Sequence, residues 1–253
     1  ESRQIHAPSG DLKQLQKKLA QRLWDVYREF IEENEIQDNI SHAFQKGKSI
    51  ITNANIHRNK RYVLNLDLKD FFDHFHFGRV RGFFMKNKNF ELPVEIATMI
   101  AQLTCYEGKL PQGAPTSPII TNLVCNILDM RLLKIAKKYR VVYTRYADDM
   151  TFSTNDKKFL ENQENFMKSI KKEIESFGFE INDKKTRLLF CDSRQEVTGL
   201  VVNKKISVNR EYCKRTRAMA DAFYRRGIFE ICGEEGSVNQ LEGRFSFINQ
   251  IDC

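Results

Sequence analysis

RVVYTRYADDMTFST (140–154) is the stretch of sequence that decides the fold. β-Branched and aromatic residues fill it on both sides of Tyr146-Ala147-Asp148-Asp149, which predicts two strands joined by a tight turn. Aspartate is disfavoured inside strands, but a pair of aspartates at a hairpin tip is common for reasons of turn geometry alone. The aspartate pair by itself therefore predicts only a turn. A functional site would need a further carboxylate beside it.

RYVLNLDL (61–68) supplies that further carboxylate. Alternate positions from Val63 to Asp67 form one face, and alternate positions from Leu64 to Leu68 form an apolar face, which predicts a strand. Asp67 stands where a strand favours a β-branched or aromatic residue, and such a local conflict invites a functional explanation.

Asp67, Asp148 and Asp149 can converge if their strands lie in one sheet. Clustered carboxylates repel one another unless cations neutralise them, and hard oxygen ligands suit Mg²⁺. Two Mg²⁺ ions roughly 3.5–4 Å apart can hold the attacking and leaving oxygens of a phosphoryl transfer. The pattern predicts metal-dependent phosphoryl transfer, for which a nucleic acid substrate needs a basic groove.

Hydrophobic periodicity predicts the remaining elements. Helices are expected at 11–33, 77–86, 92–103, 119–139, 157–177, 209–226 and 238–250, and short strands at 186–190, 197–202 and 206–208. A Gly/Pro-rich loop, GKLPQGAPTSP (108–118), precedes the fourth of these helices. This order predicts an α+β fold, an antiparallel sheet backed by helices.

The chain has 253 residues, with 41% hydrophobic and 29% charged residues, typical of a folded protein of one large or two small domains. No stretch is apolar enough for a transmembrane helix. Six widely spaced cysteines form no CxxC pattern, which disfavours a zinc module and indicates reduced thiols in a cytosolic protein. The chain opens ESRQIHAPSG without an initiator Met, so we expect a fragment of a longer protein.

Positive charge is concentrated near the C-terminus. Forty-one Lys and Arg face 33 Asp and Glu over the whole chain, a formal net charge of +8, and residues 184–226 alone hold twelve basic against four acidic residues. On the helix at 209–226, Arg210, Lys214 and Arg217 share one face, which predicts contact with a phosphate backbone. A merely solvated basic face is the alternative.

Five stretches resemble motifs A to E of reverse transcriptases, in the order of that family. They are LNLDLKDFF (64–72), LPQGAPTSP (110–118), RYADDMTFS (145–153), GFEINDKKT (178–186) and VTGL (197–200). NANIH (53–57) and Val197-Thr198-Gly199 further resemble the NAxxH and VTG elements of the bacterial retron subgroup. The resemblance implies a right-hand polymerase fold with a palm sheet, helical fingers and a partial thumb.

The resemblance also implies a division of the chain. Residues 1–60 would be part of the fingers with the NAxxH element, 61–202 the palm with fingers helices interleaved at 77–110, and 203–253 the start of the thumb. Two alternatives stay open: a group II intron-like or other bacterial reverse transcriptase, and a non-catalytic RNA-binding scaffold with this fold. The three aspartates disfavour a scaffold, because carboxylates repel a nucleic acid.

Catalytic and nucleotide-binding roles follow from the resemblance position by position. Asp67 and Asp148 would bind two Mg²⁺ ions, with Asp149 and the Leu68 carbonyl as further ligands. The residues expected to meet the incoming dNTP are Arg3, Asp70, Phe71, Phe72, Gln112, Gly113 and Lys185. Phe72 would exclude a ribose 2′-hydroxyl, and either Lys184 or Lys185 would donate a proton to pyrophosphate; two solvated lysines are the alternative.

RNA-binding roles are implied for Asn53, His57, Val197, Thr198 and Gly199, in addition to the basic helix. Asn53 and His57 could instead support the active site.

The function implied is RNA-directed DNA synthesis on the protein's own structured non-coding RNA. Synthesis would start from a 2′-hydroxyl and give a branched RNA–DNA product. The expected partners are that RNA, dNTPs and an effector protein in antiphage defence, in the bacterial cytoplasm and without a membrane.

Overall fold

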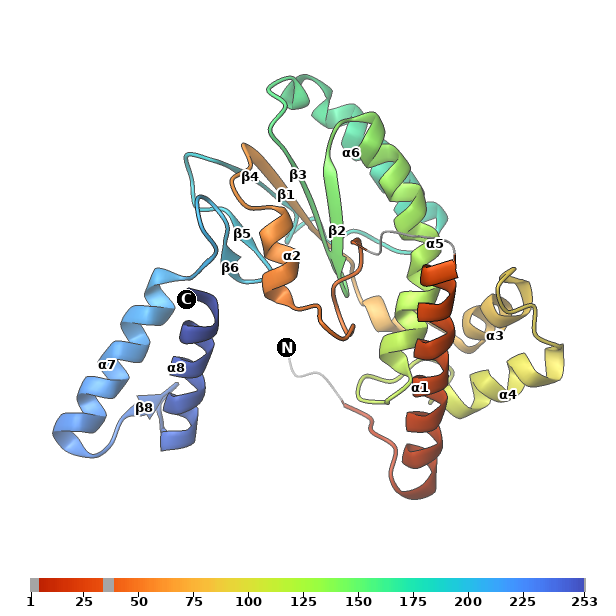
Figure 1. The fold of residues 1–253 in the computed structure, drawn as a ribbon, viewed down its shortest axis with the longest axis horizontal. Coiled ribbons are helices and arrows are strands. Elements are labelled where there is room, and N and C mark those ends of the chain that lie inside the picture. The colour runs from red at the N-terminus through yellow and green to blue at the C-terminus, as the bar shows by residue number, and fades with distance from the viewer. Residues whose placement is uncertain (1–4, 34–38, 253) are drawn as a thin grey trace.

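A four-stranded antiparallel sheet lies at the centre of the computed structural model, which describes residues 5–33 and 39–252 (Figure 1). Its strands run in the order β2-β3-β1-β4. They are β1 (Tyr62–Asp67), β2 (Val142–Tyr146), β3 (Asp149–Thr154) and β4 (Arg187–Phe190). The strands predicted around these ranges are confirmed.

Strand β1 divides its side chains between two cores, as its alternation predicts. Leu64 and Leu66, at most 3% exposed, lie in the main core together with the adjoining Leu68. Val63 points to the other face and packs in a second core with Ala54 of α2 (Ile50–Ile56). Helix α2 thus fastens a preceding segment to the face of the sheet on which Asp67 also lies.

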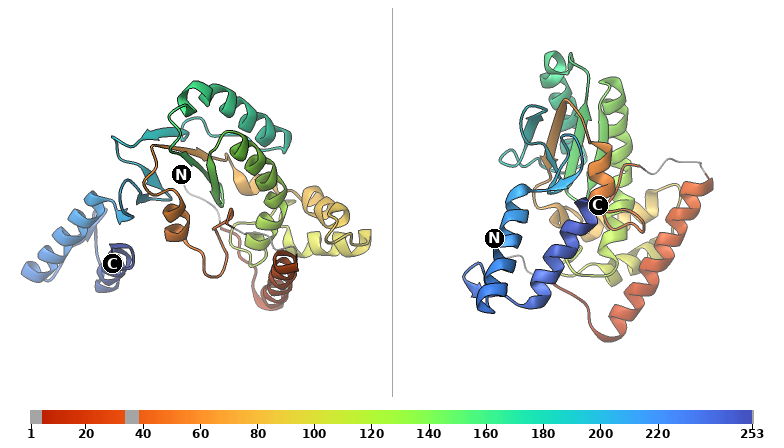
Figure 2. Two further views of the ribbon diagram at one scale, coloured as in Figure 1. Left: turned by 45° about the horizontal axis from the view of Figure 1, so that its top comes forward. Right: turned by 60° about the vertical axis from the view of Figure 1, so that its left-hand side comes forward.

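Helices α5 (Ser117–Lys138) and α6 (Phe159–Ser176) run along the main-core side of the sheet (Figure 2). Helix α5 is buried on most of its circumference, because the sheet, α6, α1 and α3 all contact it. Such a helix needs apolar residues nearly all round rather than in one stripe. Its sequence, rich in Ile, Leu and Val, meets that need.

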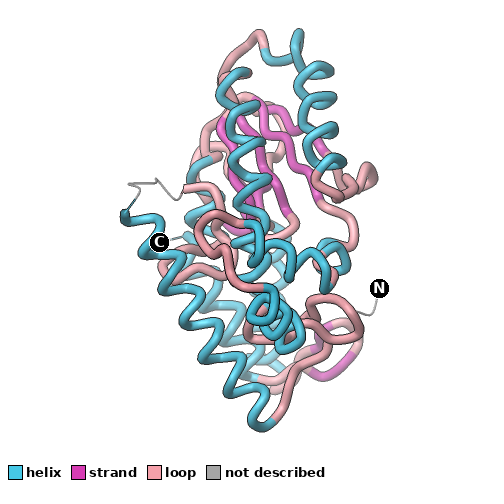
Figure 3. The backbone as a smooth tube through the Cα atoms, turned by 90° about the vertical axis from the view of Figure 1, so that its right-hand side faces the viewer, coloured by secondary structure: helices cyan, strands magenta, loops and turns pink. Residues whose placement is uncertain are grey.

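The remaining helices of the N-terminal half lie beyond one end of the sheet (Figure 3). They are α1 (Gly10–Glu33), α3 (Phe77–Lys86) and α4 (Val94–Thr104), with a short 3₁₀-helix, η1 (Phe71–His74), after β1. The helices predicted at 11–33, 77–86, 92–103, 119–139 and 157–177 are confirmed to within about two residues at each end. None of the helices in the described residues is both long and apolar enough to cross a membrane.

A small second sheet corrects the prediction of one strand over 197–202. The chain instead turns back on itself between β5 (Glu196–Val197) and β6 (Leu200–Val201), and β7 (Ser207–Val208) pairs with β6. Thr198 and Gly199, the two turn residues, have φ values of +47° and +81°. Positive φ at both central positions suits a two-residue hairpin. Because Thr198 is not a glycine, the residue type at this position did not indicate a turn.

The C-terminal residues form a lobe that stands beside the main body (Figure 1). It contains α7 (Arg210–Arg226), α8 (Val238–Asp252) and a short hairpin, β8 (Glu230–Ile231) and β9 (Glu234–Glu235). Both helices were predicted, but the hairpin and α2 were not. Ile251 near the end of α8 returns to the second core with Val208, which joins the lobe to the small sheet.

Candidate active site

The turn between β2 and β3 presents Asp148 at its tip. Tyr146 and Asp149 are the last paired residues, so Ala147 and Asp148 form a two-residue loop. Ala147 adopts φ +56°, a left-handed conformation that costs an L-residue about 1–2 kcal/mol. The surrounding structure must supply that free energy.

Asp67 ends β1 directly beside this turn. In the antiparallel pairing of β1 with β3, Asp67 stands opposite Asp149. The Leu68 amide donates a hydrogen bond of 3.1 Å to the Asp148 carbonyl, which fixes the end of β1 against the tip. The backbones of Asp67, Asp148 and Asp149 are therefore adjacent at this edge of the sheet, together with the backbone of Leu68.

Residues of the segment 180–185 hold the Asp67 carboxylate on both oxygens. The Lys185 ammonium donates to Oδ1 at 2.9 Å, and the Asn182 amide donates to Oδ2 at 3.2 Å. The Asn182 backbone amide also donates to the Asp67 carbonyl at 2.8 Å. Asn182 was not predicted, because a single polar residue in a turn carries no signal of its own. Lys184 is exposed.

The three carboxylates lie close enough for the charges of two of them to affect the pKa of the third. Desolvation, followed by the charges of Asp148 and Asp67, raises the pKa of Asp149 to about 6, against the opposing charge of Lys185. Nearby carboxylates shift one another in this way because two negative charges disfavour ionisation of a third.

The donor chemistry fits hard divalent cations, which prefer carboxylate oxygens and would offset this repulsion. Across the described residues, however, no three His, Cys, Asp or Glu side chains already converge as a ready metal site.

The segment after β1 holds Asp70, Phe71 and Phe72. Asp70 is exposed in the left-handed region at φ +45° and precedes η1. The Phe71 ring is buried and stacks on Phe179 at 5.6 Å between centroids. Phe72 is half-buried, with its ring packed edge-on to that of Phe71 at 5.4 Å. Phe71 is thus a core side chain, whereas Phe72 sits at the border between core and solvent.

Gly113 in the loop 108–116 accommodates a close approach, but by the chain's own N-terminal segment. Its φ is +115°, and a Cβ there would lie 2.8 Å from Ile5 Cγ2. The His6 amide donates to the neighbouring Gln112 carbonyl at 2.9 Å. Residues 5 and 6 therefore lie over the loop predicted to support nucleotide and template. Arg3 falls outside the described residues.

The side chains of Asn53 and His57, which were predicted to contact RNA or support the active site, are buried, at 1% and 0% exposure. His57 shares hydrogen bonds of 2.7 Å with Ser153 on β3 and with Thr144 on β2. The Thr144 hydroxyl donates to Asn53 at 2.6 Å. These hydrogen bonds join Asn53 of α2 and His57 at its C-terminal end to β2 and β3, the two strands that flank the aspartate turn.

The VTG turn lies against the same helix. The Val197 side chain is buried in the second core, and the Thr198 hydroxyl donates to the Ile50 carbonyl at 3.3 Å. Gly199 is exposed. Of the three residues predicted to bind RNA here, Val197 therefore packs internally, and the turn at Thr198 and Gly199 offers backbone to the outside.

Helix α7 exposes the basic residues that its sequence places on one face. Arg210, Lys214 and Arg217 are all exposed. On the packed face, the Arg244 guanidinium of α8 lies 3.9 Å from the centroid of the Tyr212 ring and donates to the Thr216 hydroxyl at 3.0 Å. The packing of α7 therefore does not use its basic face.

Comparison with known proteins gives a family match over most of the chain. A model described as "Reverse transcriptase (RNA-dependent DNA polymerase)" matches residues 1–214. Retron Ec86 reverse transcriptase from Escherichia coli is 34% identical over 251 residues, which is 99% of this chain and 72% of that protein. Retron Mx65 reverse transcriptase from Myxococcus xanthus is 35% identical over 232 residues, 86% of this chain and 52% of that protein.

Among solved structures, telomerase from Candida albicans is similar with a TM-score of 0.51 and 12% sequence identity. The match covers 95% of this chain and 45% of the telomerase chain. At this identity the likeness concerns the fold alone, and it agrees with the right-hand arrangement expected from the sequence.

Proposed function

The chain belongs to the reverse transcriptase family of RNA-dependent DNA polymerases, and on this premise we propose that Asp67, Asp148 and Asp149 form its polymerising centre. The relatives reported above are retron reverse transcriptases, so the polymerase is of retron type. The observation that carries the proposal is the register of β1 against β3, which sets Asp67 opposite Asp149 with Asp148 at the adjoining tip.

Two Mg²⁺ ions are the proposed cofactor. Asp67 and Asp148 would hold both ions, and Asp149 with the Leu68 carbonyl would add ligands. Bound there, the ions would supply positive charge to the primer hydroxyl and to the leaving pyrophosphate. The chain's own contribution is to fix the carboxylates: Leu68 ties strand β1 to the tip, and Asn182 with Lys185 orients Asp67.

Nucleotide selection is proposed for Phe72. Its ring is held edge-on by Phe71, which in turn stacks on Phe179, so an aromatic cluster fixes the direction of the ring. A fixed ring at the sugar position would leave no room for a 2′-hydroxyl and would favour dNTPs. Asp70, Gln112 and Gly113, together with Arg3, would complete the nucleotide site.

Lys185 rather than Lys184 is proposed as the proton donor to pyrophosphate. Its ammonium donates a hydrogen bond to the Asp67 carboxylate, whereas Lys184 is an exposed residue next to it in the chain. An ammonium beside the reacting phosphates both balances their charge and can supply a proton to the leaving group.

The proposed template is a structured non-coding RNA of the protein's own retron. Similarity to retron enzymes over nearly the whole chain supports this template, with priming from a 2′-hydroxyl and a branched RNA–DNA product. The exposed basic face of α7 and the turn at Thr198 and Gly199 would meet that RNA, and residues 203–253 would be the start of the thumb. An effector protein and a role in antiphage defence in the cytoplasm belong to the same proposal.

Primer extension with the full-length protein tests the centre. An RNA template annealed to a DNA primer, with dNTPs and Mg²⁺, should give DNA, and Asp148→Asn should abolish extension. RNA affinity and the melting temperature should stay close to the wild-type values, because losing one carboxylate relieves repulsion. Normal extension by the folded variant would refute the assignment. Sequencing nucleic acid that copurifies with the wild type tests the template, where a linear DNA without a 2′ branch would refute the priming mode.

A further inference from the structure

A fully buried guanidinium lies beneath the turn that carries Asp148. Arg145 belongs to β2, and its side chain has no exposed surface. Its Nε donates to Asp129 Oδ1 at 2.9 Å and its Nη2 to Oδ2 at 2.8 Å. Two parallel bonds of this kind fix a guanidinium in position and orientation, since the fork matches the carboxylate.

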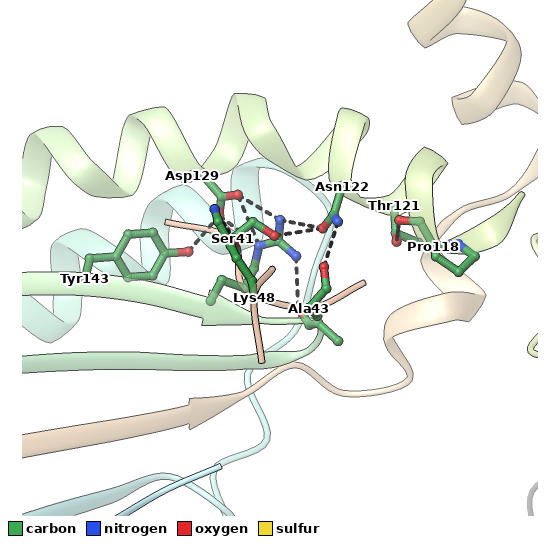
Figure 4. Close-up of polar contacts among 10 residues, drawn as sticks. Ser41, Ala43, Lys48, Pro118, Thr121, Asn122, Asp129 and Tyr143 are labelled. Atoms are coloured by element: carbon green, nitrogen blue, oxygen red, sulfur yellow. Dashed lines mark hydrogen bonds and ion pairs between the residues drawn. The ribbon is translucent and has the colours of Figure 1, made fainter. Parts of the chain in front are cut away.

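Asp129 is itself fixed from α5. The Tyr143 hydroxyl donates to Oδ1 of this carboxylate at 2.8 Å, and Figure 4 shows Asp129 and Asn122 extending from one helix, Asp129 toward Tyr143 and Asn122 toward Ser41 and Ala43. Burial lowers the pKa of Arg145, but the charge and hydrogen bonds of Asp129, together with Cys125 and Tyr143, raise that pKa above its usual value, so the guanidinium stays charged. The pair forms a rigid base rather than a mobile surface contact.

The third nitrogen of the Arg145 guanidinium contacts the turn. Nη1 donates to the Ala147 carbonyl at 3.1 Å, and Ala147 is the residue in the left-handed conformation next to Asp148. A non-glycine residue keeps such a conformation only where its surroundings impose it. The hydrogen bond from Arg145 is one contact that imposes it from inside.

The backbone of Arg145 ties a further segment to the same point. Its amide donates to the Ile40 carbonyl at 2.8 Å, and its carbonyl accepts from the His42 amide at 2.9 Å. The Ser41 hydroxyl donates to Asn122 Oδ1 at 2.9 Å, and the Asn122 amide donates to the Ala43 carbonyl at 3.0 Å. Residues 40–43, α5 and the aspartate turn therefore meet around one side chain.

We propose that Arg145 is a positioning residue for polymerisation: from its base on Asp129 it binds the Ala147 carbonyl and thereby sets where Asp148 stands relative to Asp67. The inference rests on the proposed role of these aspartates. A buried ion pair kept only for stability can often be replaced by apolar residues without loss. An apolar replacement cannot reproduce the hydrogen bond from Arg145 to the Ala147 carbonyl.

Arg145→Lys is the first test, in primer extension by the full-length protein on RNA annealed to a DNA primer. Lysine keeps a charge for Asp129, but one ammonium lacks the planar fork that serves Asp129 and Ala147 together. We expect kcat to fall by about 10- to 100-fold, because small displacements of reacting groups cause rate losses of this size. The Mg²⁺ concentration for half-maximal rate should rise, while the KM for dNTP and the RNA affinity stay within about twofold.

Tyr143→Phe is the matched control. It removes a hydrogen bond from the same Asp129 carboxylate and leaves the bond between Arg145 and Ala147 in place. We expect it to lower the melting temperature but to keep kcat and the Mg²⁺ requirement near wild type. Equal losses of kcat in Tyr143→Phe and Arg145→Lys at equal loss of stability would overturn the inference.

A double variant, Arg145→Met with Asp129→Leu, guards against misfolding of the single change. It removes both charges at once, so neither is left buried and unpaired. We expect a folded protein with kcat still reduced; wild-type kcat in this variant would overturn the inference. An inactive wild-type chain would refute the proposed function, whereas an active wild type with an unaffected Arg145→Lys variant refutes the inference alone.

Discussion

The Nζ atom of Lys185 lies 2.9 Å from Oδ1 of Asp67, although the two residues are 118 positions apart in the sequence. The lysine side chain is 55% exposed and the aspartate 10%, so water screens the pair on one side only. A half-exposed ion pair contributes about 0.2–1 kcal/mol to stability. The pair is therefore better placed to orient a reacting carboxylate than to hold the fold together.

Lys185→Ala should slow nucleotide incorporation with little change in the melting temperature. Loss of a positioned proton donor costs on the order of 10²-fold or more, and loss of charge balance adds to it. Single-turnover rates with a preannealed primer–template measure the effect. Lys184→Ala is the matched control, a change of the same charge at the adjacent exposed residue. A larger loss in Lys184→Ala would reverse the assignment of the two lysines.

Phe72→Val should let the enzyme accept ribonucleotides. The smaller side chain vacates the space that the ring would deny to a 2′-hydroxyl, and steric discrimination of this kind is worth roughly 10- to 200-fold. The ratio of kcat/KM for dNTP over rNTP measures it. Phe71→Leu serves as control: because Phe71 is buried in the core, that change should lower the melting temperature and leave the ratio alone. An unchanged ratio in folded Phe72→Val would make Phe72 a packing residue only.

Replacing Arg210, Lys214 and Arg217 together with Gln should weaken RNA binding and make it less sensitive to salt. Each lost phosphate contact reduces the slope of log K against log salt by roughly 0.7–0.9. Binding titrations of the structured RNA at several salt concentrations measure this slope. The same replacement of Lys168, Lys171 and Lys172, exposed on α6, removes equal charge elsewhere. If both triple variants lose the same slope, the effect is one of net charge and α7 has no special part.

The buried His57 should make folding stability depend on pH. Burial, with the charges of Lys60 and His42 in addition, lowers the pKa of His57 to about 3, against 6.5 for the unperturbed side chain. Between these values the unfolded chain binds a proton that the folded chain does not. Stability is therefore full above pH 6.5 and falls as the pH drops toward 3, with His57 contributing about 1.4 kcal/mol per pH unit within that window.

Urea unfolding of wild type and His57→Gln at pH 8 and pH 5 measures this contribution. The variant should be less stable at pH 8, because it disturbs the bonds to Thr144 and Ser153, but it should lose less stability on going to pH 5. A parallel loss in both proteins would mean that His57 takes no part in the pH dependence.

Hydrophobic residues that repeat every two positions, or with the period of a helix, predicted the sheet and nearly all long helices. These repeats show which side of a strand or helix is buried. The same logic placed Asp67 and the pair Asp148–Asp149 at one point. The same patterns could not predict the contacts of Asn53 and His57. Their i, i+4 spacing is evident in the sequence, but their partners, Thr144 and Ser153, lie on strands distant in sequence. An i, i+4 pair looks the same whether it faces solvent or a hydroxyl.

Arg145 and Asn182 were missed for a related reason. An arginine in a strand and an asparagine in a turn are ordinary on an exposed surface, and only the tertiary structure shows one buried against Asp129 and the other bonded to Asp67. The hairpin at Thr198 was missed because a threonine with positive φ breaks the usual link between turn and glycine.

The pairing of residues 62–67 with 149–154 also fixes when the centre can form during synthesis. At about 5–20 residues per second, β1 leaves the ribosome on the order of ten seconds before β3 can pair with it. Throughout that interval β1 has neither β3 nor β4 beside it, since both follow later in the chain. A nascent chain that stalls between these strands therefore displays a bare apolar strand without any assembled centre, and it becomes a substrate for chaperones or aggregation.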